Sequence, residues 1–151
     1  MVPDFTYRTI HAPFEKNFLK EVLALYKIIF EDADETFFLE RIQSKKSIMA
    51  NLCYGNGNLI GFKIGYQYNE STFYSWVGGV HEDFRGKGIA SELLQRQHLE
   101  AKKQGYSKMR TKSMNRFKPM MQLNLKNGFD IVQVYTNDSN QTKIVFEKSL
   151  D

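Results

Sequence analysis

The stretch of sequence with the most distinctive chemistry covers residues 80–91 and combines glycines with basic side chains. Arg85, Gly86, Lys87 and Gly88 lie there, directly before a segment with helical periodicity. The first N–H groups of a helix lack intrahelical partners and lie at the positive end of its dipole, so they attract anions. Glycines let an anion approach these N–H groups closely. The pattern predicts a phosphate-binding turn, and a basic turn that merely contains two glycines is the alternative.

Two common phosphate-binding motifs do not match this stretch. A P-loop requires glycine at position 81 and Ser or Thr directly after Lys87, but the sequence has His81 and Gly88 there. A dinucleotide-binding fingerprint requires a third glycine at position 91, which is Ser91, and it normally follows an opening strand. Neither class of nucleotide-binding protein is therefore predicted.

The hydrophobic pattern places the glycine-rich turn between a strand and a helix of a mixed α/β fold. A meander over residues 48–80 predicts antiparallel pairing, and the strand–helix–strand unit at 72–113 predicts one parallel pair. We therefore expect a mainly antiparallel sheet with helices on its faces. The expected helices cover residues 14–30, 36–44, 87–104 and 115–127, and the expected strands cover residues 5–10, 48–54, 60–68, 72–80, 108–113, 129–135 and 142–148.

Two details of the meander concern the surroundings of the turn. In the strand at 60–68, alternation puts Ile60 and Phe62 on one face and Lys63 on the other. Gly78 and Gly79 stand late in the next strand, where glycines indicate a bulge or the close approach of another backbone or a ligand.

Length and composition set limits on the class of protein. The chain has 151 residues, 42% of them apolar and 14% aromatic, which disfavours disorder, and residues 1–151 read as one domain. No apolar run approaches the roughly 18 residues of a membrane span, and no export signal is visible, so no membrane partner is expected. The single cysteine, Cys53, excludes an intrachain disulfide and points to the cytoplasm.

The net charge of +4 is unevenly divided along the chain. Residues 1–75 hold eight Lys/Arg and nine Asp/Glu, whereas residues 76–151 hold thirteen and eight. The positive excess therefore lies in the half that contains the glycine-rich turn. It indicates either an anionic ligand at that turn or a solvated basic face, and no nucleic acid partner is expected.

The turn resembles the Arg/Gln-x-x-Gly-x-Gly/Ala signature of the GNAT superfamily of N-acetyltransferases. The matching run is Arg85-Gly86-Lys87-Gly88-Ile89-Ala90, with Val80 upstream, Asn115 after the next strand and Asn127-Gly128-Phe129 opening the following one. The order of expected elements also resembles that of the family over about residues 5–148. The resemblance implies a GNAT-type domain with a six- to seven-stranded sheet, a splayed parallel pair of strands and about four helices.

The resemblance implies a cleft for acetyl-coenzyme A between the two splayed strands. The backbone near Gly78 and Val80 would pair with the pantetheine arm, and the signature N–H groups would hold the pyrophosphate. Asn115 matches a family asparagine that contacts pantetheine, and a helix N-cap is its alternative role. The implied cofactor-binding residues are Gly78, Val80, Arg85, Gly86, Lys87, Gly88, Ile89, Ala90, Ser91 and Asn115.

The catalytic groups depart from the family pattern. Many relatives have a tyrosine as general acid at the position that is Asn124 here, and an amide is not a useful proton donor near neutral pH. Relatives often have a carboxylate base on the fourth strand, but residues 72–80 contain no Asp or Glu. Tyr74 on that strand could hold a water that relays a proton, or simply be a lining aromatic. Tyr74 and Asn124 are therefore the candidate catalytic residues.

The acceptor is expected to bind near the acidic segment between the first two helices. Glu31, Asp32, Asp34 and Glu35 could attract a cationic amine, or they could be a solvated turn with helix-capping duty. The histidines lack metal-ligand spacing, so no metal is predicted.

The resemblance implies a transferase that moves the acetyl group of acetyl-CoA to a primary amine by direct attack in a ternary complex. The amine would belong to a small molecule or a protein, and the resemblance also admits a homodimer. A GNAT-fold module that binds coenzyme A with little catalysis, as a sensor or interaction module, is the alternative.

Overall fold

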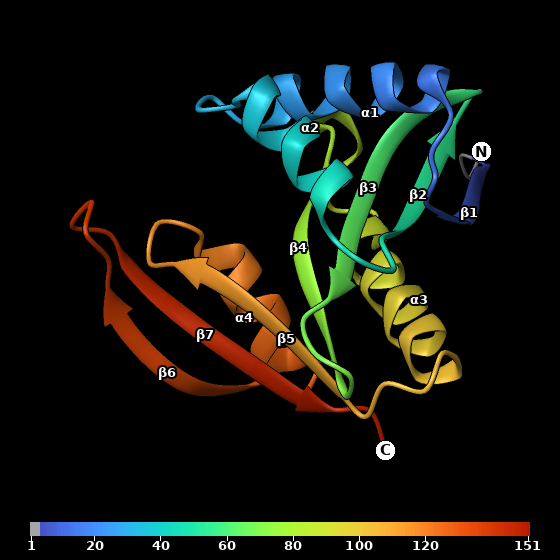
Figure 1. Cartoon of the computed structure of the whole chain (residues 1–151). Helices are drawn as coiled ribbons and strands as arrows, with labels where there is room; N and C mark the ends of the chain where they lie inside the picture. The colour runs from blue at the N-terminus through green and yellow to red at the C-terminus, as the bar shows by residue number, and fades with distance from the viewer. Residues whose placement is uncertain (1–3) are drawn as a thin grey trace.

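The computed structural model describes residues 4–151, which form a seven-stranded sheet with α-helices on both faces (Figure 1). The strand pattern of the sequence is therefore realised as one continuous sheet. The strands are β1 (Phe5–His11), β2 (Met49–Gly55), β3 (Asn58–Gln67), β4 (Thr72–Val80), β5 (Lys108–Met114), β6 (Asp130–Thr136) and β7 (Thr142–Ser149). The α-helices are α1 (Lys16–Ile29), α2 (Glu35–Ser44), α3 (Ile89–Lys103) and α4 (Lys118–Lys126), and a short 3-10 turn, η1 (Glu82–Phe84), precedes α3.

The sheet has the order β1-β2-β3-β4-β5-β7-β6, and β4–β5 is its parallel pair. All its other neighbours run antiparallel. In Figure 1 the strands β5, β7 and β6 curve away from the half of the sheet that contains β1–β4. The expected α/β fold, with a mainly antiparallel sheet and one parallel pair, is confirmed.

Two layers of apolar side chains hold the helices to the sheet. Val22 of α1 and Phe38 of α2 are fully buried against Ile64 on one face. Leu94 and Ala101 of α3 pack against Phe73 and their neighbours on the other face, where Met121 and Leu123 of α4 join them. Both faces of β3 and β4 are thus covered by helices, so side chains on either face of these strands are shielded from solvent.

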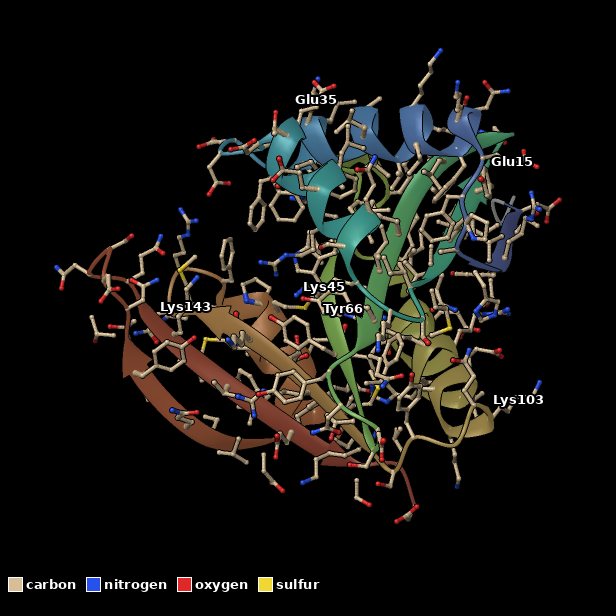
Figure 2. The ribbon with its side chains drawn as sticks, viewed as in Figure 1. Glu15, Glu35, Lys45, Tyr66, Lys103 and Lys143 are labelled. Carbon is tan, nitrogen blue, oxygen red and sulfur yellow. The ribbon has the colours of Figure 1, made fainter. Side chains whose placement is uncertain are left out.

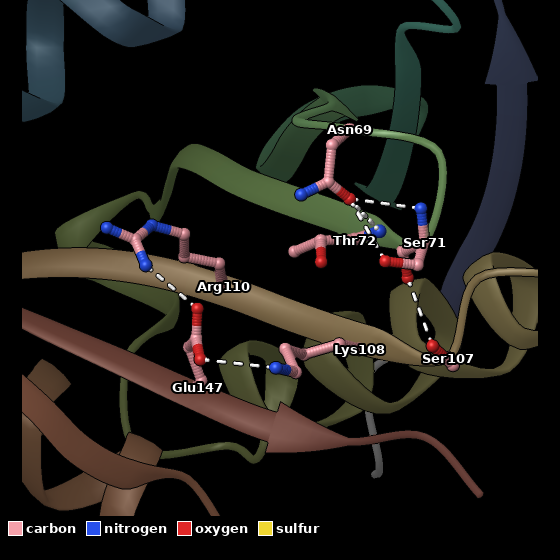
Figure 3. A network of polar contacts seen from close by, with 7 residues as sticks. All are labelled: Asn69, Ser71, Thr72, Ser107, Lys108, Arg110 and Glu147. Carbon is pink, nitrogen blue, oxygen red and sulfur yellow. Dashed lines mark hydrogen bonds and ion pairs between the residues drawn. The ribbon is translucent and has the colours of Figure 1, made fainter.

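The start of the parallel pair is fastened by a polar network (Figure 3). Asn69 Oδ1 accepts hydrogen bonds from the N–H groups of Ser71 and Thr72 at 3.0 and 2.8 Å. The Ser71 carbonyl in turn accepts from the N–H groups of Ser107 and Lys108. The turn before β4 is therefore tied directly to the first residues of β5, at the end of the pair farthest from the glycine-rich turn.

Two expectations about the elements are wrong in detail. Ile60 does not share a face with Phe62, because a bulge between Leu59 and Gly61 turns it toward Val80 and the α3 side of the sheet. The fourth helix begins at Lys118 rather than at Asn115, with Phe117 as its N-cap. Asn115 is therefore not a helix cap.

Candidate functional site

A cleft of about 510 Å³ lies beside the end of β4, and five different helices and strands contribute to its walls. The end of α1 and the strands β3 and β4 form one side, and the first turns of α3 and α4 form the other. The lining residues are Ile29, Phe30, Phe62, Lys63, Gly78, Gly79, Val80, Phe84, Arg85, Gly86, Gly88, Ile89, Ala90, Ser91, Leu93, Phe117, Pro119, Met120 and Leu123.

The cleft exists because β4 and β5 stay paired over only part of their length. Their register runs from Thr72 with Lys108 to Ser75 with Thr111, and the remaining five residues of β4 have no partner in β5. At the last pair, Thr111 Oγ1 donates a buried hydrogen bond of 2.8 Å to the Ser75 carbonyl. Beyond this point the two strands diverge and leave one side of the β4 backbone facing the opening, as the family resemblance implied.

The far end of the cleft is a turn whose backbone conformation requires glycine. Gly86 and Gly88 have φ angles of 77° and 81°, in the left-handed region that other residues enter only with strain. Gly88 is the N-cap of α3, so the N–H groups of the next three residues point out of the helix end. A Cβ atom at either glycine would meet no other atom within 4 Å, so the turn is open on the side where these Cβ atoms would lie. This geometry fits a pyrophosphate.

The basic residues of the turn have different surroundings. Arg85 Nε donates a hydrogen bond of 3.1 Å to the Val80 carbonyl, which ties the turn back to the end of β4. Lys87 is exposed and lies outside the cleft lining, as does Asn115 in the loop after β5. The cleft therefore brings together eight of the ten expected cofactor-binding residues, and Lys87 and Asn115 lie beyond its walls.

The end of β4 is bulged and runs unusually close to its neighbours. The register with β3 skips Trp76, so this residue has no partner there. A Cβ atom on Gly78 would lie 2.8 Å from the Phe62 carbonyl oxygen, and one on Gly79 would lie 3.0 Å from Ile29. The packing thus requires glycine at Gly78, and a side chain at Gly79 would have to displace Ile29.

Tyr74 lies on the face of the sheet covered by α1 and α2 rather than in the cleft wall. Its ring contacts those of Tyr66 and Tyr68, with centroids 5.4 and 6.4 Å apart. Burial, followed by the nearby Tyr66, raises the pKa of Tyr74 to about 12. The phenol is therefore neutral at physiological pH and available only as a hydrogen-bond donor or acceptor.

Asn124 is 3% exposed, and its backbone carbonyl accepts the N–H of Phe129 at 3.0 Å. The residue beside it, Leu123, lines the cleft. Asn124 therefore has an evident part in ending α4, and the α4 wall of the cleft is apolar at this level.

The acidic segment between α1 and α2 is largely occupied by internal contacts. Asp34 caps α2 by accepting the N–H of Phe37 at 3.0 Å, and Glu35 pairs with Lys27 at 2.7 Å. Asp32 pairs with Arg116, from the loop after β5, at 3.2 Å. These contacts supply the helix-capping role that the sequence left open, and they leave Glu31 outside the ion pairs that the described residues form.

Sequence reasoning missed one ionisable residue of the cleft, Lys63 on β3. It lines the cleft, it is 8% exposed, and burial lowers its pKa to about 8. Alternation correctly placed it opposite Phe62, on a face that reads as polar. The available signal was that β3 is a central strand with both faces covered, so that a lysine on either face is buried.

In the part of the chain that the structure describes, no group of three or more His, Cys, Asp or Glu side chains has the arrangement of a metal site. None of the described helices has the length and apolar character needed to span a membrane.

The fold and the cleft define a mixed α/β domain with a binding cleft between two diverging strands, and comparison with known families identifies its class. The profile of the acetyltransferase (GNAT) domain matches residues 46–131, more than half of the chain. The chain belongs to the GNAT acetyltransferase family. A search of curated proteins by sequence finds no match.

Solved structures with the same fold cover nearly the whole chain. The ribosomal-protein-S18-alanine N-acetyltransferase of Escherichia coli is 14% identical with a TM-score of 0.79, over 97% of this chain and 95% of that one. Ard1 of Thermoplasma volcanium is 18% identical with a TM-score of 0.78, over 96% and 97% of the two chains. A GNAT acetyltransferase of Elizabethkingia anophelis with acetyl-CoA bound is 18% identical with a TM-score of 0.74, over 96% and 97%. At these identities the likeness concerns the fold.

Proposed function

We propose that the chain transfers the acetyl group of acetyl-CoA to a primary amine of a small molecule or a protein, within a ternary complex. The observation that carries this proposal is the cleft at the β4–β5 separation, which runs from a free strand edge to a glycine-rich helix N-terminus. An extended arm that ends in a pyrophosphate matches both features.

In this proposal the donor side is held mostly by the backbone. The unpaired edge of β4 near Gly78 and Val80 binds the pantetheine arm, and the N–H groups of residues 86–91 bind the pyrophosphate. Acetyl-CoA, when bound, supplies the activated thioester. Backbone N–H groups at the Trp76 bulge would stabilise negative charge that develops on the carbonyl oxygen.

We place the acceptor on the α1–α2 face of the sheet, where aromatic side chains gather. Tyr66 and Trp76 lie there with Arg41, whose Nη1 donates to the Tyr66 hydroxyl at 3.2 Å. Tyr66 and Lys45 are side by side below α2 in Figure 2, with the Lys45 amine 5.4 Å from the ring centroid. Because three of the four expected carboxylates already have partners, we assign acceptor binding mainly to this aromatic surface.

The experiment that tests the proposal is thiol release from acetyl-CoA in the presence of an amine panel. The panel contains polyamines, free amino acids, peptides with a free N-terminal amine and N-terminally blocked peptides with lysine. A thiol-reactive chromophore reports CoA, and mass spectrometry reports the acetylated amine. At least one amine is expected to raise thiol release well above the rate without acceptor.

The E. coli neighbour, whose name specifies an alanine of a ribosomal protein as its acceptor, supports the inclusion of N-terminal peptides in this panel. Binding of acetyl-CoA without acceptor-dependent thiol release from any amine would contradict the proposal. It would favour the alternative of a CoA-binding module.

A further inference from the structure

Lys63 is a buried lysine without an anionic partner, in the wall of the proposed acetyl-CoA cleft. Within residues 4–151 no carboxylate forms an ion pair with it, and burial alone accounts for the lowering of its pKa to about 8. An unpaired ammonium is costly to bury and is seldom kept without a ligand or a reaction that uses it.

The register of the sheet directs Lys63 toward the place where β4 and β5 separate. Lys63 pairs with Gly78 of β4, three residues beyond the last β4–β5 pair. A Cβ atom on Gly78 would come within 3.2 Å of Lys63 Cγ, so the side chain occupies the room that this glycine leaves. The lysine therefore passes over β4 at the level where the cleft has no β5 backbone beside it.

The ionisable groups next to Lys63 in this region are also basic. His98 of α3 lies close enough to Lys63 for the lysine charge to affect it, and His98 Nδ1 lies 3.3 Å from Lys148 Nζ of β7. Burial, followed by Lys148 and Lys63, lowers the pKa of His98 to about 3, so the imidazole is neutral. No carboxylate contributes to the pKa of either His98 or Lys63. The surroundings thus favour a negatively charged group in the cleft near Lys63.

The proposed acetyl transfer creates one such group and requires a proton for it. The C–N bond forms as the C–S bond breaks, the electron pair leaves on the sulfur of coenzyme A, and the attacking nitrogen loses one proton. Position 124, where many relatives have a tyrosine acid, is an asparagine that cannot supply the proton. Another donor is needed on the cleft wall.

We propose that Lys63 is a catalytic residue of this chain, whose ammonium group gives its proton to the departing sulfur. This inference rests on the proposed function. Lys63 becomes a neutral amine in the step and regains its proton from solvent, which receives the one lost by the attacking nitrogen. An ammonium whose pKa is near that of a thiol, about 8.5, is well matched to this transfer.

The test uses two variants of Lys63 and one matched control. Lys63→Met removes the charge and keeps an unbranched chain. Lys63→Arg keeps a charge that cannot be given up as a proton. Lys103→Met alters a lysine at the exposed end of α3, far from the cleft (Figure 2). For each protein the thiol of bound CoA is titrated by the ultraviolet absorbance of its thiolate, with desulfo-CoA as the blank.

The wild-type protein and Lys63→Arg are expected to lower the pKa of the bound CoA thiol by about one unit, a tenfold rise in thiolate. Lys63→Met is expected to abolish this shift while it still binds CoA. With any amine identified by the panel, both variants are expected to lose about 100-fold in kcat. Lys103→Met is expected to match the wild type in every measurement.

The same thiol pKa in wild type and Lys63→Met, with CoA bound in both, would overturn the role of Lys63. So would an unchanged kcat in both Lys63 variants. If Lys63→Met fails to fold, Lys63→Gln takes its place with the same expectations. Failure of the wild-type protein to bind CoA at all would instead contradict the proposed function, so the two failures are distinguishable.

Discussion

At the scale of single residues, the burial of Lys63 has a measurable cost that depends on pH. Its pKa falls from 10.5 to about 8 on folding, so between these values the unfolded chain binds more protons than the folded one. Stability therefore rises with pH across this window, and the cost of burial is fully present below it.

Lys63→Met removes that cost and is expected to stabilise the protein at pH 7 by up to about 3 kcal/mol. The advantage should shrink as the pH rises from 8 to 10.5, because the wild-type lysine then becomes neutral in both states. Urea denaturation of the two proteins at several pH values measures the difference. A variant that is less stable than wild type at pH 7 would show that Lys63 has stabilising contacts which its surroundings do not indicate.

His98 allows a similar test of stability at low pH. Its pKa falls from 6.5 to about 3 on folding, so stability is complete above pH 6.5 and is lost as the pH falls toward 3. His98→Asn keeps a hydrogen-bond acceptor near Lys148 but does not titrate. Between pH 6.5 and 3 its free energy of unfolding should therefore fall by up to about 5 kcal/mol less than that of the wild type. An equal loss of unfolding free energy with falling pH in both proteins would refute this account of His98.

The residues of the site were predictable to the extent that local backbone chemistry defines them. Gly86 and Gly88 are recognisable from sequence because a tight turn before a helix requires positive φ, and the structure places both there. Lys63 was missed, because its burial depends on helices from distant parts of the chain that cover β3, and only the central position of β3 in the expected sheet indicates it. The partners of Asp32 and Glu35 are likewise tertiary contacts.

At the scale of elements, the cleft depends on where the β4–β5 pairing stops. The Thr111 hydroxyl bonds the Ser75 carbonyl at this point, and both residues are buried. Thr111→Val keeps the shape but leaves the carbonyl without this donor, which is expected to cost about 1–3 kcal/mol in urea denaturation. Thr136→Val is the control. The Thr136 hydroxyl lies 3.4 Å from that of Thr142 on the surface, so its loss should cost much less stability. Equal costs would show that the buried bond does not hold the pair together.

The order and type of the elements followed from hydrophobic periodicity, whereas some ends and faces did not. Residues 72–80 were predicted with the bounds that β4 has, because Asn69-Glu70-Ser71 and His81 interrupt the alternation on both sides. The start of α4 was misplaced, because Asn115 is a good cap by type. Pro119, which lies in the first turn of α4, is the local signal that favours the later start. The bulge that turns Ile60 depends on pairing with β2, which alternation within one strand cannot reveal.

At the scale of the whole molecule, the uneven charge predicts how binding responds to salt. The half with thirteen Lys/Arg and eight Asp/Glu contains the glycine-rich turn, which is exposed at the end of the cleft. Raising ionic strength from about 0.1 M to about 1 M shortens the screening length from about 10 to about 3 Å. The affinity for acetyl-CoA should fall by about tenfold, whereas that for acetyl-pantetheine, which lacks phosphate, should change little. An equal response of both ligands would exclude phosphate recognition by this half.

The central claim is that the turn before α3 binds the pyrophosphate of acetyl-CoA, and one calorimetric titration tests it most directly. Acetyl-CoA is titrated into the wild type, Gly88→Ala and Gly57→Ala. Both glycines have a φ of 81° and open space around them, so both substitutions cost about 1–2 kcal/mol of backbone strain, but Gly57 lies in the β2–β3 turn. We predict tight binding to wild type and Gly57→Ala and at least a tenfold loss in Gly88→Ala. Equal affinity in all three proteins would contradict the account.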